Sequence, residues 1–316
     1  PIAGLLVSGY ALGVVLGAPV MTLGTARMDR KSLLVGLMAL FVIGNLISAL
    51  APNYETILAG RIVSSLMHGA FFGVGSVVGA QLVPKEKQAR AIALMFSGLA
   101  FSNILGVPLG TALGQYVSWR ASFALISILG LMSGTFLFFA LKPQIPDQVG
   151  AVSKELSVFQ RKEVWLALAT TTFGFGGVFV VWTYIAPLLR EATGLSPNQM
   201  TFVLFLYGIG LTLGNHVMGR MCDKSLKLSL YGILGALVLL MTIFSFTMTN
   251  VWTASLVIFL FGFAAFGTIP PLQIGIMHAA KGAPNLASAL NILSLIHISE
   301  PTRPEMISYA VFCLKK

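Results

Sequence analysis

The sequence predicts an all-α protein that crosses a membrane many times, and three observations support this prediction. Hydrophobic residues make up 56% of the 316 residues and charged residues 9%, whereas a soluble domain carries about 25% charged residues. The apolar residues form continuous runs near the ~20 residues that a membrane helix needs, well beyond the ~10 residues of a barrel strand. Cations gather in every second connection between these runs. The composition therefore excludes a soluble enzyme.

Nine apolar stretches predict nine membrane helices, and a tenth begins near Leu286. In chain order they are 3–23, 33–51, 57–83, 91–116, 123–141, 164–188, 200–221, 228–249 and 252–277. The connections after the odd-numbered stretches hold almost all the loop cations, namely Arg27, Arg30, Lys31, Lys85, Lys87, Arg90, Lys142, Lys154, Arg161, Lys162, Arg220, Lys224, Lys227 and Lys281. The other connections hold only Arg120 and Arg190. The positive-inside rule makes the cation-rich connections cytoplasmic. Residue 1 then lies on the outer side, and we expect at least one more membrane helix before it.

Charge and cysteine content exclude several kinds of site. The net charge of +10 comes from cations scattered between apolar runs, so the chain has no basic face for a nucleic acid. Two cysteines provide neither a disulfide framework nor a cluster with metal-ligand spacing. The sequence contains no phosphate-binding loop, nucleophile triad or zinc signature. We therefore predict that the chain is not an enzyme and has no catalytic residue, no metal and no cofactor.

The C-terminal residues 293–316 differ in composition from the rest of the chain and read LSLIHISEPTRPEMISYAVFCLKK. The strings LSLIHISEPTR and ISYAVFCL both back-translate into segments of a sequencing-library adapter, in one reading frame and separated by an index-sized gap. We interpret 293–316 as an adapter artefact that, like a fusion scar, contributes nothing to the fold. A natural amphipathic tail is the alternative.

The chain also contains a weak internal repeat. TLGTARMDRKSLL follows the first stretch and GRMCDKSLKLSL follows the seventh; a shift of 197 residues superposes Arg27 on Lys224 and Ala26 on Asp223. The longest polar connection lies between the two copies. Two parallel membrane halves joined by a polar linker are typical of secondary transporters built from repeats. The predicted organisation is an N-terminal bundle over 1–141, a cytoplasmic linker over 142–163 and a C-terminal bundle over 164–292.

Four stretches carry a family resemblance: YALGVVLGAP (10–19), HGAFFGVGSVVGA (68–80), LGVPLGTALGQYVSWRASF (105–123) and GFGGVFVVWTY (174–184). Through them residues 1–292 resemble the major facilitator superfamily, most closely the bacterial arabinose-efflux permeases of its drug:proton antiporter branch. The resemblance implies a two-bundle helical fold, of which this chain holds spans two to ten. It also implies a monomer in the bacterial inner membrane, whose partners are the lipid bilayer, a small solute and protons.

Two family motifs are recognisable in this sequence. The cytoplasmic loop motif G-x-L-x-D-R-x-G-R-R is matched in the second half by Gly219, Met221, Asp223 and Lys224. In the first half Ala26 stands where the acid belongs, while Arg30 and Lys31 keep the basic end. The antiporter motif G-P-x-x-G-G is matched loosely by Gly106, Pro108 and Gly110. The resemblance assigns these residues to conformational change.

The third stretch holds the ionisable residues that lie within the membrane. Arg61, Ser65, His68 and Phe72 recur at a spacing that places them on one helical stripe. Arg61 and His68 are two turns apart, about 10.5 Å at ~1.5 Å per residue. Because an ionisable residue in a membrane helix is costly, it is a candidate functional residue by default. The alternatives are that Arg61 snorkels to the outer interface and that His68 is a neutral imidazole bonded between helices.

Other candidates for the transport pathway are neutral. Asn103, Asn215 and Gln273 either bind solute or bond a neighbouring helix, and the second is favoured. Trp182 and Tyr184 are two residues apart and point to different sides, so at most one faces the pathway; an interfacial aromatic belt is the alternative.

These features predict a secondary active transporter that couples protons to the efflux of a small organic solute, a sugar or a drug, by rocking its halves around a midplane cavity. An uptake symporter or facilitator of the same fold is one alternative, and a non-transporting membrane receptor is another. No carboxylate lies inside the nine stretches. The proton carrier is therefore His68 or an acid in the helix expected upstream, and we favour the acid because the resembled permeases carry one there.

Overall fold

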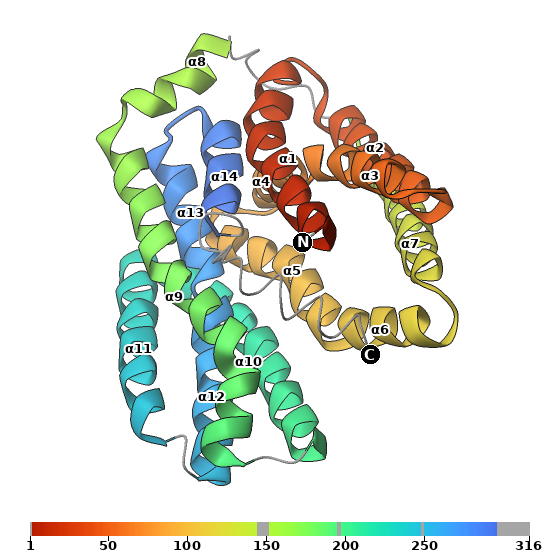
Figure 1. Cartoon of the computed structure of the whole chain (residues 1–316). Helices are drawn as coiled ribbons and strands as arrows, with labels where there is room; N and C mark the ends of the chain where they lie inside the picture. The colour runs from red at the N-terminus through yellow and green to blue at the C-terminus, as the bar shows by residue number, and fades with distance from the viewer. Residues whose placement is uncertain (1, 144–151, 195–196, 248–249, 296–316) are drawn as a thin grey trace. The chain divides into compact units, whose positions relative to one another are not determined.

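The computed structural model describes residues 2–143, 152–194, 197–247 and 250–295, and all of the regular secondary structure in these residues is helical (Figure 1). The helices are α1 (Ile2–Gly24), α2 (Arg30–Leu50), α3 (Tyr54–Leu66), α4 (His68–Gln81), α5 (Gln88–Phe101), α6 (Val107–Tyr116), α7 (Trp119–Ala140), α8 (Val152–Leu156), α9 (Lys162–Thr193), α10 (Pro197–Lys224), α11 (Leu226–Thr247), α12 (Val251–Gly267), α13 (Ile269–Ala279) and α14 (Pro284–Leu293). The predicted adapter segment lies outside the described residues from 296 onward.

The apolar stretches predicted from the sequence form long helices. Within the described part, seven are long and apolar enough to cross a membrane, and α1 adds a shorter apolar helix over Gly9–Gly24. α9 covers the predicted stretch 164–188. The fold is therefore the predicted all-α membrane fold.

Three of the predicted spans are interrupted helices. The stretch 57–83 becomes α3 and α4, with Met67 between them, and 91–116 becomes α5 and α6, joined by a π-helical turn over Ser102–Gly106. The stretch 252–277 breaks at Thr268, because Pro270 and Pro271 lack the N–H groups that would continue the α12 ladder. The prolines instead lie in the first turn of α13, where no intrahelical donor is needed.

Helix starts fall into two groups, and the difference matters for the site. α2, α3, α7 and α12 each begin with a polar side chain that accepts a hydrogen bond from a backbone N–H of its own first turn; the capping residues are Asp29, Asn53, Ser118 and Asn250. Lys87 and Ala283, which hold the same position before α5 and α14, make no such bond. These two helices therefore take any side-chain cap from elsewhere in the chain.

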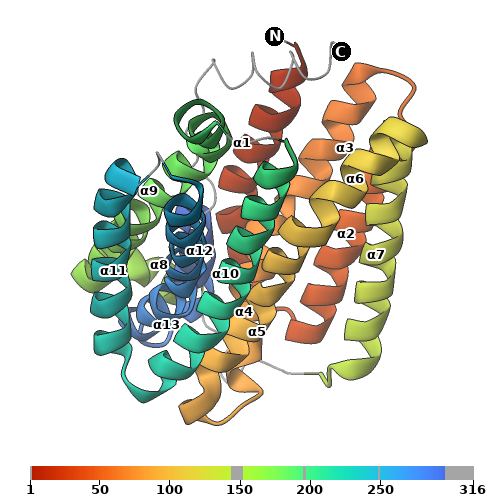
Figure 2. The same cartoon turned by 90° about the horizontal axis from the view of Figure 1, so that it is seen from below.

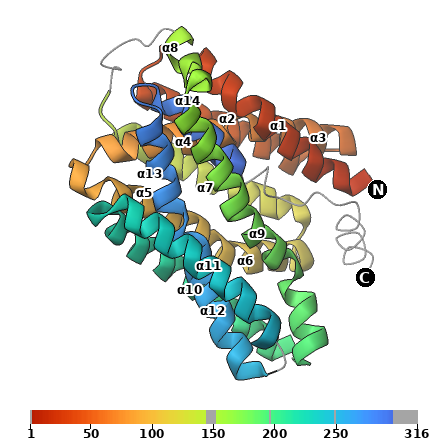
Figure 3. The same cartoon turned by 90° about the vertical axis from the view of Figure 1, so that its left-hand side faces the viewer.

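The chain divides into two compact units. The first comprises the described residues within Pro1–Val77, Leu109–Trp165 and Ala280–Lys316. There α2 lies between α3 and α7 (Figure 2), and α1 packs against both α3 and α14. The second comprises Val78–Pro108 and the described residues within Leu166–Ala279. There α10 packs along α12, with α11 beside them (Figure 3), and α5 packs against α10 and α13.

The two units do not follow the two predicted halves, because each unit combines helices from both. α14, from the second half, lies in the first unit against α1, and α5, from the first half, lies in the second unit against α10. Contacts between helices of different halves therefore define the units. The division into bundles over 1–141 and 164–292 stays a prediction.

Candidate functional site

Arg61, His68 and Tyr10 form a polar cluster within the apolar helices of the first unit. Arg61 comes from α3, His68 begins α4, and both are half-buried. The Arg61 Cζ lies 4.1 Å from the centre of the Tyr10 ring, a cation–π distance, and the Tyr10 hydroxyl lies 3.0 Å from His68 Nδ1. Tyr10 therefore contacts both of the ionisable residues that the sequence singled out.

Two phenylalanine rings complete the surroundings of this cluster. The ring of Phe123, from α7, has its centre 6.0 Å from the Arg61 Cζ. The ring of Phe72, one turn after His68, lies 5.2 Å from the imidazole, centre to centre. Together these residues offer guanidinium donors, one hydroxyl and one imidazole beside aromatic faces. Such a mixture suits a small solute that has both hydrogen-bonding groups and an apolar surface.

Sequence reasoning did not single out Tyr10. It lies in the stretch that carries the family resemblance, but its partners are 51 and 58 positions further along the chain. No local periodicity connects residues so distant. A polar aromatic residue in the middle of an apolar stretch is the one signal that could have drawn attention to it.

Asn215 bonds a neighbouring helix in the second unit. Its side chain is fully buried on α10, and its Nδ2 donates to the Ala93 carbonyl at 2.5 Å and to Ser97 Oγ at 3.3 Å. Both partners are on α5, so this geometry corresponds to the packing alternative.

One turn further along α10, Gly219 allows the two helices to approach closely. A Cβ added to Gly219 would lie 2.6 Å from the Cβ of Ala93, so any larger side chain would force α5 and α10 apart. Gly219 therefore belongs to the same contact as Asn215.

Asp223, the acid of the loop motif in the second half, binds the start of α5. Asp223 Oδ1 accepts a hydrogen bond from the Ala89 N–H at 2.8 Å, and Asp223 Oδ2 lies 3.7 Å from Arg90 Nε. Lys224, the last residue of α10, is exposed. Because Lys87 gives α5 no side-chain cap, the carboxylate of Asp223 supplies one from another helix.

The remaining predicted pathway and motif residues in this part of the chain lie on the turn after α5 and on α6, α9 and α13. Asn103 is exposed on the π-helical turn, which also contains Gly106. Gly110 accepts a hydrogen bond from Ser122 at 3.0 Å through its carbonyl. Gln273 is fully buried on α13. The side chains of Pro108, Trp182 and Tyr184 lie outside the described part of the structure, although all three residues are helical.

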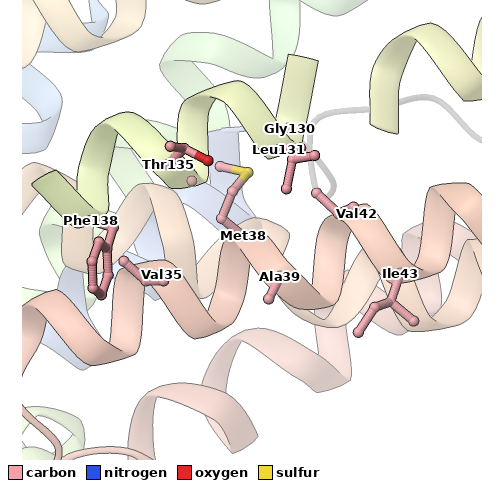
Figure 4. A pocket seen from close by; sticks show the side chains of 10 residues that line it. Val35, Met38, Ala39, Val42, Ile43, Gly130, Leu131, Thr135 and Phe138 are labelled. Atoms are coloured by element: carbon pink, nitrogen blue, oxygen red, sulfur yellow. The ribbon is translucent and has the colours of Figure 1, made fainter. Parts of the chain in front are cut away.

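The basic end of the first motif copy lies at the start of α2. Arg30 is its first residue, and Lys31 Nζ stands 4.6 Å from the centre of the Phe138 ring on α7. Next to this pair, a groove of about 340 Å³ runs between α2 and α7 (Figure 4). Thr135 is the single polar side chain in its lining, which otherwise consists of Val35, Met38, Ala39, Val42, Ile43, Gly130, Leu131, Gly134 and Phe138. A lining so poor in polar groups suits lipid tails rather than a hydrophilic solute.

Comparisons with known proteins agree with this architecture. The model of the Major Facilitator Superfamily matches residues 1–296. The inner membrane transport protein YdhP of Escherichia coli K12 is 44% identical over 292 residues, which cover 92% of this chain and 75% of that protein. The putative transporter AraJ of the same organism is 37% identical over 291 residues, 92% of this chain and 74% of that protein. A probable sugar efflux transporter of Pasteurella multocida is 30% identical over 291 residues, 91% of this chain and 71% of that protein.

Solved structures share the fold at low sequence identity. The Escherichia coli fucose:proton symporter FucP superposes with a TM-score of 0.76 at 14% identity, over 100% of this chain and 85% of that one. The proton:xylose symporter XylE gives 0.74 at 16% identity, over 99% of this chain and 81% of that one. At these identities the likeness concerns the fold alone.

Proposed function

Because this chain belongs to the major facilitator superfamily, we propose that it is a proton-driven antiporter that expels a small organic solute, with a sugar as the favoured class. Family membership makes the protein a membrane transporter and not an enzyme. The relative named as an inner membrane transport protein supports the bacterial inner membrane as its location. The efflux direction and the solute class are supported by the relative named as a sugar efflux transporter.

The cluster around Arg61 is the observation that carries this proposal. The Arg61 guanidinium lies against the Tyr10 ring, and the Tyr10 hydroxyl is hydrogen-bonded to His68. These groups present several hydrogen-bond donors at membrane depth. Since burying these groups is costly, their presence is explained best by a solute that they bind. The hydroxyls of a sugar accept hydrogen bonds from the guanidinium, and its carbon face lies against the aromatic rings.

The contact between α10 and α5 supplies the conformational part of the mechanism. Alternating access needs contacts that form in one state and break in the other. Asp223 bridges the cytoplasmic ends of two helices from different predicted halves, and Gly219 lets these helices touch. We propose that this clamp, the bond of Asp223 to the start of α5, stabilises the conformation in which α5 and α10 are in contact. The clamp breaks when the transporter changes to its other conformation.

Transport in membrane vesicles tests the proposal. In inside-out vesicles with an acidic interior, the full-length antiporter is expected to accumulate a labelled sugar from a panel against its gradient. A facilitator only equilibrates the sugar, and a symporter accumulates none under these conditions. Arg61→Ala should abolish accumulation, while Arg220→Ala, an exposed arginine at the cytoplasmic end of α10, should leave it near the parental level. Accumulation by the Arg61→Ala variant would overturn the assignment of the site.

A further inference from the structure

Helix α14 begins without a side-chain cap of its own. Its N-cap residue is Ala283, whose methyl group accepts no hydrogen bond, and its first residue is Pro284. The first backbone donors that need a partner belong to the next residues of the turn. Leu286 N–H donates to Glu155 Oε2 at 3.0 Å, and Asn285 Nδ2 donates to Glu155 Oε1 at 2.9 Å. The cap of α14 therefore comes from the linker helix α8.

Glu155 is a buried residue beside the start of α14 and not part of an exposed surface contact. Its exposed fraction is 7%, although it belongs to a short helix of the polar linker. Arg30, from the basic end of the first motif copy, interacts electrostatically with it. Further along the linker Val158 is fully buried, and the guanidinium of Arg161 donates to the Lys281 carbonyl at 3.4 Å, in the turn that leads into α14.

The internal repeat shows what this contact replaces. The shift of 197 residues that superposes Ala26 on Asp223 also superposes Ala89 on Leu286. Ala89 is the residue whose N–H donates to Asp223, and Leu286 is the residue whose N–H donates to Glu155. Equivalent helix starts thus receive equivalent carboxylates, but only one carboxylate comes from the loop motif. Ala26, at the equivalent motif position, is buried, with 7% of its surface exposed, and has no carboxylate.

The end of α14 that Glu155 binds is next to a tight helix contact. Ser288 Oγ donates to the Gly73 carbonyl on α4 at 3.0 Å. A Cβ added to Gly73 would lie 2.7 Å from the backbone of Ala289, so the two helices touch backbone to backbone. These contacts lie within the first two turns of α14, beside α1 and α4 (Figure 1). A carboxylate that fixes the start of α14 therefore also fixes its contact with α4.

We propose that Glu155 is a positioning residue of the transport cycle: from the linker it supplies the carboxylate that Ala26 lacks and stabilises the state in which α14 packs on α4. This inference rests on the proposed alternating-access function. The bond of Glu155 to the start of α14 is then a second clamp on the cytoplasmic side, beside the clamp that Asp223 forms with α5.

Cysteine labelling tests the clamp without solute or proton gradient, so its failure is distinguishable from a failure of the efflux proposal. A Ser288→Cys reporter is placed in a full-length transporter whose native cysteines, Cys222 among them, are replaced, and inside-out vesicles are treated with a membrane-impermeant maleimide. Glu155→Ala, which removes the accepting oxygens, should raise the labelling rate about tenfold, equivalent to about 1.4 kcal/mol and within the range for loss of a helix cap. Glu163→Ala, at an exposed acid close by in sequence, is the matched control and should keep the parental rate.

Rescue decides whether Glu155 truly replaces the motif acid. Adding Ala26→Asp to the Glu155→Ala variant should return the labelling rate to within about twofold of the parent, since the new carboxylate can cap α14 from the motif position. An unchanged rate in Glu155→Ala would overturn the clamp. A raised rate that Ala26→Asp does not lower would overturn the replacement and leave Glu155 a merely structural residue. Detergent-denatured samples normalise the labelling, and gel filtration checks that each variant is folded.

Discussion

Replacing Asp223 separates the two physical contributions of its clamp to α5. Asp223→Ala removes the cap on the Ala89 N–H, which contributes about 1 kcal/mol by the usual cost of losing a helix cap. It also removes the pair with Arg90, whose side chain is 45% exposed; solvent screening limits that pair to about 0.3 kcal/mol. The sum predicts a shift of about tenfold toward the state in which α5 and α10 separate.

Asp223→Asn distinguishes the cap from the charge. An asparagine oxygen caps a helix about as well as a carboxylate, so only the weak pair with Arg90 and part of the helix-dipole attraction are lost. The expected shift is about twofold. Both variants are measured by maleimide labelling of a Ser97→Cys reporter on α5, which Asn215 contacts in the parent. Asp29→Ala is the control, since Asp29 caps its own helix α2. Equal shifts for the Ala and Asn variants would refute the capping argument, and no shift for either would refute the clamp.

Two further variants address the cluster and the helix contact. His68→Gln should keep most pH-driven transport, because the amide can replace the imidazole as the partner of the Tyr10 hydroxyl; solute binding that persists while the pH gradient no longer drives transport would instead make His68 the proton carrier. Gly219→Val should lower the free energy of unfolding by about 1–3 kcal/mol, because its Cβ would lie 2.6 Å from that of Ala93 and overpacks the contact. Thermal unfolding in detergent measures this loss, and an unchanged midpoint would contradict the close approach.

Hydropathy predicted the helical fold well, because a bilayer imposes both the length and the apolarity of each helix. The orientation inferred from loop charge stays a prediction. The break before Pro270 and Pro271 has a cause that is visible in the sequence, since a proline lacks the N–H that continues a helix. The interruption at Met67 was not predicted. Gly69 lies two residues after Met67, but glycine is common within membrane helices and so does not distinguish this position.

The candidate site shows the limit of sequence reasoning more clearly. Helical spacing places Arg61 and His68 on one stripe, because both lie on the same stretch. Tyr10 joins them through tertiary contacts that no periodicity reveals. Packing was the favoured role of Asn215 and solute binding the alternative, and its hydrogen bond to the Ala93 carbonyl agrees with packing. Glu155 was one charge among several in a polar linker until its contact with Leu286 was visible.

A combined variant tests whether the two clamps bias one conformational change. Glu155 and Asp223 cap helices in separate units, and no shared partner connects them among the described residues. Their free energies should therefore add. If one two-state equilibrium governs both helix ends, Asp223→Ala must raise labelling of the Ser288→Cys reporter although Asp223 does not touch α14. The double variant Glu155→Ala, Asp223→Ala should then label about a hundredfold faster than the parent while the open form stays a minority, the product of two tenfold shifts. If Asp223→Ala leaves that reporter at the parental rate, the two helix ends open independently. A single alternation between two states would then be wrong for this transporter, even if each clamp works locally.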